Sequence, residues 1–398
     1  MPGFLTADKT EIRCDGRKVT LTGVNLGGWL LMEAYILHAP NLAEQKFKKE
    51  FADRLGERAL AQFEKNFRDH FIQEKDVAAI ASWGMTCLRV PFNATLVENA
   101  PYRYEGRGVA YLDRVIRWAK KYGIRVILDL HAAPGAQNHD WHSDSLGEAL
   151  LWKDKSFQAR TLRLWEFLAE RYKDEPAIAG YDILNEAVLQ DTKLLNRFYK
   201  ELIAAIRSID RNHLLFIEGN RWAQDLDCLD DFADDNLALS VHYYQPMEFT
   251  FNLISFLRYP LRADPERFDR RAIRKVMEGY AKLAQKRKRP VYLGEFGVNA
   301  RCGLFGEDAW VRDVVSCCRE FDFHWTYWTY KAVKNHLFPD GIYSLVDNLP
   351  WVNRAGPLCG WDTYATHWPK RRVDMIRSWE TKAFTLNKEI LHALKSGY

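Results

Sequence analysis

Short apolar runs and longer amphipathic stretches alternate along the chain. The runs are rich in aliphatic and β-branched residues, as in Arg125–Leu130, whereas the stretches repeat apolar residues every three or four positions, as in Lys193–Ser208. This alternation is typical of a parallel α/β fold. Eight runs have the strand pattern: Thr20–Asn25, Met85–Val90, Arg125–Leu130, Ile178–Leu184, Leu214–Glu218, Leu237–Tyr243, Val291–Gly294 and His324–Trp328.

Helical patterns separate most of these strands. After the fifth strand the pattern is weak, because Trp222–Phe232 is short and acidic. Eight consecutive strands with helices between them predict the α/β class and, within it, a (β/α)8 TIM barrel. A doubly wound open sheet is the structural alternative, but that fold rarely needs eight consecutive units. The predicted helices are Glu74–Trp83, Tyr111–Tyr122, Phe157–Tyr172, Lys193–Ser208, Arg270–Gln285, Asp308–Phe321 and the final Met375–Leu394.

The segments outside the alternating strands and helices predict a plug at one end of the barrel and an active site at the other. Glu11–Cys14 and Lys18–Leu21 flank Asp15-Gly16, which predicts an N-terminal β-hairpin, and such a hairpin can plug the bottom of a barrel. Long loops follow several strands, and in this fold those loops gather at one face and form the active site. No repeat or linker is found, so residues 1–398 are predicted to form a single domain. The long loops are Leu30–Asn66, Ala133–Lys155, Gln245–Phe268 and Ala332–Lys370.

Composition narrows the function class. The net charge is +4 and basic residues alternate with acids, which argues against a nucleic-acid partner. The 7 Cys have neither zinc-site nor disulfide spacing, and no apolar run reaches the roughly 18 residues of a membrane span. The N-terminus lacks a signal-peptide pattern, so we expect a cytoplasmic location, or a secreted protein if such a signal has been removed. A monomer is the default expectation.

Polar or aromatic side chains stand at the carboxyl ends of nearly all the predicted strands. Two of them are glutamates on the fourth and seventh strands, which face each other across the mouth of a closed barrel. Glycoside hydrolysis needs two carboxyl groups on either side of a sugar, about 5–5.5 Å apart for retention and about 6.5–9.5 Å apart for inversion. The strand-end residues are Arg89, Asp129, His131, Asn185, Glu186, Glu218, His242, Tyr244, Glu295 and Trp328.

The neighbours of the two glutamates fit two different tasks. Arg89 can keep a carboxylate ionised and Tyr244 can donate a hydrogen bond to it, which suits a nucleophile. The acid must instead hold a proton near neutral pH, as burial and a nearby negative charge favour. Asn185 is placed to bind a sugar hydroxyl, and Glu218 is interpreted as a structural or supporting group.

These motifs, taken together and in order, resemble those of glycoside hydrolase family 5, and the opening motif resembles its exo-β-1,3-glucanase-like members. The resemblance spans nearly the whole chain. It rests on Gly23-Val-Asn-Leu-Gly-Gly-Trp-Leu, Leu88-Arg-Val-Pro, Asp129-Leu-His-Ala-Ala-Pro-Gly-Ala-Gln-Asn, Ile183-Leu-Asn-Glu, Val241-His-Tyr-Tyr, Leu293-Gly-Glu-Phe-Gly and Tyr327-Trp-Thr-Tyr-Lys.

The resemblance implies a role for each matched residue. Glu186 would be the acid/base and Glu295 the nucleophile of a retaining β-glycoside hydrolase, which cleaves β-glucosidic bonds in β-glucans, oligosaccharides or β-glucosides without a metal or organic cofactor. The carbohydrate substrate would be the partner of the site. The implied supporting residues are Arg89 and Tyr244 beside Glu295, His131 and Asn185 on sugar hydroxyls, His242 beside Glu186, Trp328 under the cleaved sugar and Glu33 on the non-reducing sugar.

Three alternatives stay open. The same machinery serves a β-mannosidase, an endo-glucanase or a glycolipid β-glucosidase, and the loops that decide this differ from known exo-glucanases at His139–Ser145. A metal-dependent hydrolase would use His131, His242 and the cluster His139, Asp140, His142 and Asp144, but this cluster has no regular ligand spacing and is interpreted as a polar substrate loop. A non-catalytic carbohydrate-binding barrel is disfavoured by the presence of both glutamates.

Overall fold

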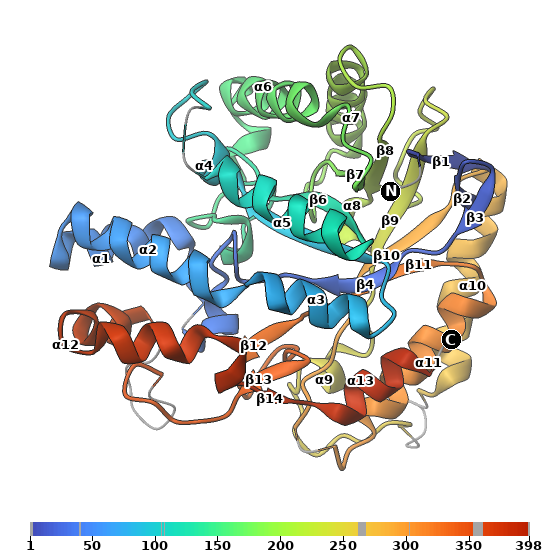
Figure 1. Cartoon of the computed structure of the whole chain (residues 1–398). Helices are drawn as coiled ribbons and strands as arrows, with labels where there is room; N and C mark the ends of the chain where they lie inside the picture. The colour runs from blue at the N-terminus through green and yellow to red at the C-terminus, as the bar shows by residue number, and fades with distance from the viewer. Residues whose placement is uncertain are drawn as a thin grey trace.

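Eight parallel strands close into a barrel (Figure 1). The computed structural model describes residues 3–39, 41–104, 106, 108–261, 268–301, 303–352 and 361–396. The barrel closes where Trp325 of the last strand pairs with Thr22 of the first, so the barrel prediction is confirmed and the open-sheet alternative is wrong. The strands are β4 (Thr22–Asn25), β5 (Cys87–Asn93), β6 (Arg125–Ala132), β7 (Ile178–Asp182), β8 (Leu214–Glu218), β9 (Leu237–His242), β10 (Val291–Glu295) and β11 (His324–Tyr327).

Helices surround the barrel at the predicted places, with ends that differ from the prediction by a few residues. In α7 (Thr192–Arg207), Leu195, Leu202 and Ile206 lie on one buried face. The Asp191 side chain caps its first turn by accepting a hydrogen bond from the backbone N–H of Lys193. Residues 219–236, all described, contain one short helix, as the weak pattern predicted. These helices are α3 (Glu74–Ser82), α5 (Val109–Tyr122), α6 (Lys155–Tyr172), α7 (Thr192–Arg207), α8 (Asn220–Ala223), α10 (Arg270–Arg287) and α11 (Glu307–Glu320).

A small antiparallel sheet plugs the amino-terminal end of the barrel. The predicted hairpin is present as β2 (Glu11–Cys14) and β3 (Arg17–Val19), and β1 (Leu5–Asp8), which was not predicted, pairs with β2. Leu5 and Ile12 are buried in an apolar cluster with the barrel residues Ile127, Phe216 and Tyr292. The sheet therefore closes the end that faces away from the long loops, as Figure 1 shows.

All four predicted loops contain regular structure, and the first and last contain the most. The first holds α1 (Glu44–Leu55) and α2 (Glu57–Phe71), which lie beside α12 (Trp361–Trp379) in Figure 1. The last loop holds two strands of a separate three-stranded sheet and the start of α12, and residues 353–360 of it lie outside the described residues. The remaining short elements are α4 (Ala94–Val97), α9 (Met247–Thr250), β12 (Lys331–Val333) and β13 (Tyr343–Leu345).

The prediction of one final helix over Met375–Leu394 is wrong. Helix α12 ends at Trp379, β14 (Thr385–Leu386) follows, and α13 (Lys388–Lys395) begins after it. The break has two causes. Ser344 and Tyr343 of β13 pair with β14, and the side chain of Asn387 accepts from the backbone of Ile390 to start a new helix.

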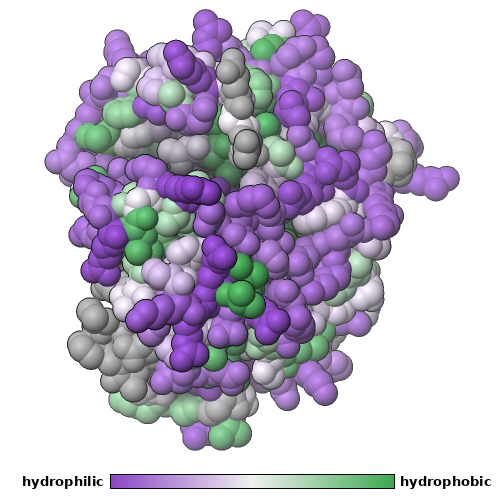
Figure 2. Space-filling view, turned by 60° about the vertical axis from the view of Figure 1, so that its left-hand side comes forward, coloured by the Kyte–Doolittle hydropathy of each residue, from purple (hydrophilic) through white to green (hydrophobic). Residues whose placement is uncertain are grey.

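The apolar side chains are mainly inside. One continuous core fills the space between the barrel and its helices, and the plug forms a second core at the barrel bottom. The face in Figure 2 is mostly hydrophilic, with small separate hydrophobic groups. No helix in the described ranges is long and apolar enough to cross a membrane. The described cysteines, Cys14, Cys87, Cys228, Cys317 and Cys318, are free thiols.

Candidate active site

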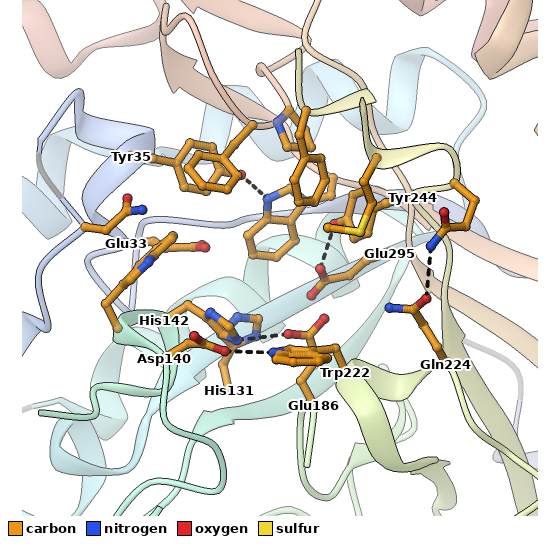
Figure 3. A pocket seen from close by; sticks show the side chains of 18 residues that line it. Glu33, Tyr35, His131, Asp140, His142, Glu186, Trp222, Gln224, Tyr244 and Glu295 are labelled. Atoms are coloured by element: carbon orange, nitrogen blue, oxygen red, sulfur yellow. Dashed lines mark hydrogen bonds and ion pairs between the residues drawn. The ribbon is translucent and has the colours of Figure 1, made fainter. Parts of the chain in front are cut away.

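A cavity of about 520 Å³ lies at the carboxyl ends of the barrel strands (Figure 3). Arg89, Asn185 and His242 do not line it, but are buried behind its wall. The arrangement thus brings all the predicted site residues together, in two layers. Those that line the cavity are Glu33, His131, Glu186, Tyr244, Glu295 and Trp328.

Glu295, at the end of β10, is held through both carboxylate oxygens. Oε1 accepts a hydrogen bond from Arg89 Nη1 at 2.6 Å, and Oε2 accepts one from the Tyr244 hydroxyl at 2.8 Å. Burial raises the pKa of Tyr244 well above its usual value, so the phenol keeps its proton and stays a donor. These contacts fix the carboxylate in one orientation and place Arg89 and Tyr244 beside Glu295, as predicted.

Arg89 connects Glu295 to three further buried carboxylates. Nε donates to Asp182 at 2.9 Å, and Nη2 lies 3.1 Å from Glu218 and 3.2 Å from Asp129. Burial alone would lower the pKa of Arg89, but the surrounding carboxylates raise it well above its usual value and keep the group charged. A planar guanidinium can satisfy several acceptors at once, so it serves as the rigid centre of the network. Glu218 is buried against Arg89, where the sequence interpretation expected a structural or supporting group.

Glu186 follows β7 in a left-handed backbone conformation, with φ 44°. This conformation is uncommon for a residue with a side chain, and surrounding contacts must hold it. The Glu186 N–H donates to Glu218 Oε2 at 2.5 Å, and its carbonyl accepts from Asn138 Nδ2 at 2.9 Å. The backbone of this residue is therefore fixed on both sides.

Two histidines hold the Glu186 carboxyl group. His242 Nδ1 lies 2.6 Å from Oε1, and His142 Nε2 lies 2.9 Å from Oε2. Burial alone would raise the pKa of Glu186, but these hydrogen bonds outweigh it and hold the pKa well below its usual value. His242 lies beside Glu186, where it was predicted, whereas the sequence placed His142 only in a polar substrate loop and predicted no contact with Glu186.

The protonation of both histidines follows from the same contacts. Burial opposes the charge on each imidazole, but the neighbouring carboxylates raise the pKa of His142 to about 9 and that of His242 well above its usual value. Before a sugar binds, these contacts favour the carboxylate form of Glu186 and the charged form of both imidazoles.

The two glutamates lie close together. One oxygen of Glu186, one oxygen of Glu295 and one ring nitrogen of His242 all lie within 4.8 Å of one another. Figure 3 shows both carboxyl groups directed at the same part of the cavity. Inversion needs a gap of about 6.5–9.5 Å for a water molecule, whereas direct attack needs about 5–5.5 Å. The observed separation suits direct attack.

The predicted sugar-contact residues occupy different positions. His131 stacks parallel to Trp328, with 5.4 Å between ring centroids, and Trp328 donates to the Tyr35 hydroxyl. Burial lowers the pKa of His131 to about 3, so this imidazole is neutral. Asn185 is fully buried; its Oδ1 accepts from Arg89, and its Nδ2 has no hydrogen-bond partner in the described structure.

The loop His139–Ser145 does not gather its polar residues around one point. Asp140 accepts from Trp222 Nε1 at 2.7 Å, Asp144 accepts from Asn93 Nδ2 at 2.9 Å, and His142 contacts Glu186. Within the described ranges, the group that could hold a metal ion is Glu186, His242 and Glu295. Both carboxylates there already accept hydrogen bonds at both oxygens, so this geometry fits a hydrogen-bonded acid pair better than a ligand set.

The fold and this acid pair define the class of glycoside hydrolases built on a barrel, and comparison with known sequences agrees. The family described as Cellulase (glycosyl hydrolase family 5) matches residues 48–334. The chain belongs to glycosyl hydrolase family 5 and is a β-glycoside hydrolase, as the motifs predicted.

Relatives with different printed activities are similar to this chain. A beta-xylosidase of Phanerodontia chrysosporium is 34% identical, over 80% of this chain and 68% of that protein. Endoglucanase C of Acetivibrio thermocellus is 29% identical, over 79% of this chain and 92% of that protein. A glucan 1,3-beta-glucosidase of Blumeria graminis is 29% identical, over 60% of this chain and 58% of that protein. The structure of endoglucanase Cel5A from Thermotoga maritima has the same fold, with a TM-score of 0.63 and 23% identity over 94% of this chain and 96% of that one.

Proposed function

We propose that this enzyme is a retaining, exo-acting β-glucosidase with Glu295 as nucleophile and Glu186 as acid/base. The observation that carries the proposal is the separation of the two carboxyl groups, whose oxygens approach within 4.8 Å. Such a gap has no room for a water molecule between the sugar and the nucleophile. Glu295 is also the carboxylate fixed by Arg89 and Tyr244, which leaves Glu186 for proton transfer.

The reaction then has two steps. In the first, Glu295 attacks the anomeric carbon while Glu186 gives a proton to the leaving oxygen, and a covalent glycosyl-enzyme forms. In the second, Glu186 takes a proton from water, and the water oxygen displaces Glu295 from the anomeric carbon. The neutral His131 and the indole of Trp328 form the wall against which the sugar ring would rest.

Exo action is supported by Glu33. This carboxyl group is buried in the cavity wall, and burial raises its pKa well above the usual value. Its Oε2 has no hydrogen-bond partner in the described structure, and a buried acceptor without a partner is costly. Hydroxyl groups of a terminal sugar would satisfy it. The resemblance to exo-acting relatives assigns the same role to Glu33.

An endo-glucanase is the second candidate, because Endoglucanase C is matched over 92% of its length. The two candidates differ in their products. We expect reduced cello- or laminari-oligosaccharides to release glucose alone from the non-reducing end. Release of cellobiose or longer products from the first time point would favour the endo-glucanase instead.

The sugar and the stereochemistry are tested together. We expect 4-nitrophenyl β-glucoside to be hydrolysed faster than the β-xyloside, β-mannoside and β-galactoside, although the beta-xylosidase relative makes the xyloside the main competitor. Proton NMR of the first product should show the β-anomer. Incubation with a 2-deoxy-2-fluoro-β-glucoside, followed by peptide mass spectrometry, should place the label on Glu295. Release of the α-anomer first would contradict retention.

A further inference from the structure

His142 belongs to none of the motifs that identify the family, yet it contacts the acid/base. Its Nε2 lies 2.9 Å from Glu186 Oε2, on the oxygen that His242 does not occupy. The ring is largely buried, with 14% of its side chain exposed, and it lines the cavity. Figure 3 shows it directed at Glu186 from the loop after β6.

Asn138 organises the loop that carries this ring, and its Nδ2 also lies 3.2 Å from His142 Nε2. The Asn138 side chain accepts from the Asp140 N–H at 2.9 Å, and Ser143 Oγ donates to the Asp140 carbonyl at 2.8 Å. The same Asn138 side chain donates to the Glu186 carbonyl at 2.9 Å. The loop and the acid/base are therefore fixed to each other at two points, one through the backbone of Glu186 and one through its carboxyl group.

Titratable groups surround His142, and those nearest to it are mainly acidic. They are negative at Glu186, at Glu33 when ionised and at Asp140, and these three raise the pKa of the imidazole against the effect of burial. The neighbouring His131, 6.2 Å away between ring centroids, is neutral. Behind Glu186 lie His242, which bonds its other oxygen, and Glu295.

The resting state raises a question for an acid catalyst. Glu186 must deliver a proton in the first step, but two imidazolium donors favour its ionised form. Groups this strongly coupled share their protons, so the proton count belongs to the pair and not to one residue. A proton on His142 is one short hydrogen bond away from Glu186 Oε2.

We propose that His142 is a positioning residue that stores the proton of the acid/base and exchanges it with Glu186 in each catalytic cycle. The proposal rests on the assignment of Glu186 as acid/base. In the first step the proton moves from His142 Nε2 to Glu186 Oε2 and on to the leaving oxygen, while Glu295 bonds to the anomeric carbon. His142 is then neutral. In the second step Glu186 takes a proton from water, the water oxygen replaces Glu295, and the proton returns to His142.

The test variant is His142→Gln, whose side-chain amide can donate a hydrogen bond but cannot carry the proton. We expect kcat/KM for alkyl β-glucosides to fall by about 100-fold, the usual contribution of positioned proton transfer. For 2,4-dinitrophenyl β-glucoside, whose leaving group needs no proton, we expect a change below about 3-fold in the glycosylation step. A structural defect would instead lower kcat/KM for both substrates by the same factor.

The pH profile gives the second readout. In the wild type the shared proton is held to high pH, since the pKa of His142 is about 9. Without His142 the alkaline limb of kcat/KM should move to lower pH by about one unit or more, because one of the two proton carriers is gone. The matched control is His139→Gln on the same loop, whose side chain is 55% exposed and lies 3.6 Å from Asp140. This control should leave the limb unchanged.

An unchanged limb and an equal loss on both leaving groups in His142→Gln would overturn the proposal while leaving the glycosidase assignment intact. If that variant does not fold, histidine ¹⁵N NMR of the wild type and of Glu186→Gln tests where the proton is held. Two imidazoles should stay charged above pH 7.5, and both should titrate at lower pH in Glu186→Gln. An assigned His142 resonance that does not respond to Glu186→Gln would contradict storage on His142. Absence of turnover in the wild type, on every glycoside tested, would instead contradict the proposed function.

Discussion

The two ends of the barrel have opposite chemistry although the same strands build them. On β6, Ile127 belongs to the apolar cluster under the plug, and Asp129 belongs to the charged network. On β8, Phe216 and Glu218 divide in the same way. Alternate residues of a strand point to the same side. Two inward-facing residues that are two positions apart therefore lie in successive layers of the barrel interior, one apolar and one charged.

The apolar end of the barrel contributes mainly to stability, and the charged end mainly to catalysis. The apolar end buries side chains against a small sheet, and none of the described plug residues lines the cavity, whereas the charged end holds four carboxylates around Arg89. Buried ion pairs are costly to assemble and seldom the best source of stability. The charged end is therefore explained by what it does to Glu295, and changes at the two ends should have different effects.

The largest effect should come from Glu295→Ala. It removes the group that forms the covalent intermediate, so kcat should fall on the order of 10⁶-fold, as for other enzymes that lose their nucleophile. The melting temperature should stay near that of the wild type, because Arg89 keeps its other carboxylate partners. Steady-state kinetics and thermal unfolding check both statements. Wild-type turnover in this variant would refute the assignment.

Next comes Arg89→Met, which should affect stability and catalysis together. Loss of the cation leaves Asp182, Asp129 and Glu218 buried without their partner, and breaking such a network costs about 3–5 kcal/mol. The unpaired carboxylates would take up protons in the folded state, so the variant should be more stable at pH 5 than at pH 8. Urea unfolding at both pH values measures this. Equal stability at the two would contradict the network.

Ile12→Ala addresses the opposite end. Ile12 is fully buried under the barrel, and removal of a large aliphatic side chain from a core costs about 2–5 kcal/mol. We expect that loss in urea unfolding, with kcat and KM within about 2-fold of the wild type, because no plug residue lines the cavity. The exposed Arg17 of the same hairpin supplies the control, since Arg17→Ala should alter neither quantity. A strong loss of turnover in Ile12→Ala would show that the two ends are coupled.

The smallest change in free energy should come from Tyr244→Phe. This change removes one of two hydrogen bonds to Glu295 and leaves the ring. A hydrogen bond to a charged group contributes about 1.5–3 kcal/mol, so kcat/KM should fall by roughly 10- to 100-fold with little change in stability. Kinetics on 4-nitrophenyl β-glucoside and a melting curve decide. A value equal to that of the wild type would mean that Arg89 alone holds the nucleophile.

Much of this architecture was predictable from the sequence because local patterns carry it. The barrel strands are short aliphatic runs, and each polar residue that follows such a run is at the carboxyl end of its strand, so Glu186 and Glu295 were placed on the correct face. Helix α2 was missed, although Phe63, Phe67 and Phe71 are four residues apart on one buried face. Treating the whole interval as a loop hid that spacing.

Other features depend on contacts that no local pattern shows. The break between α12 and α13 is set by pairing with β13, more than 40 residues earlier in the chain. The position of His142 depends on a loop whose shape comes from Asn138 and Ser143, and neither residue has a periodicity to detect. The sequence therefore indicated a polar substrate loop there, but not the contact with Glu186.

The aromatic cluster between α2 and α12 has a consequence for biosynthesis. Phe63 packs against Trp368 and Trp379, and Phe67 also packs against Trp379, so residues about three hundred positions apart complete one cluster. A ribosome adds roughly 5–20 residues per second, so the phenylalanine face of α2 waits on the order of 15–60 seconds for its partner. During that interval the nascent chain exposes apolar surface, and transiently exposed apolar surface is prone to aggregate.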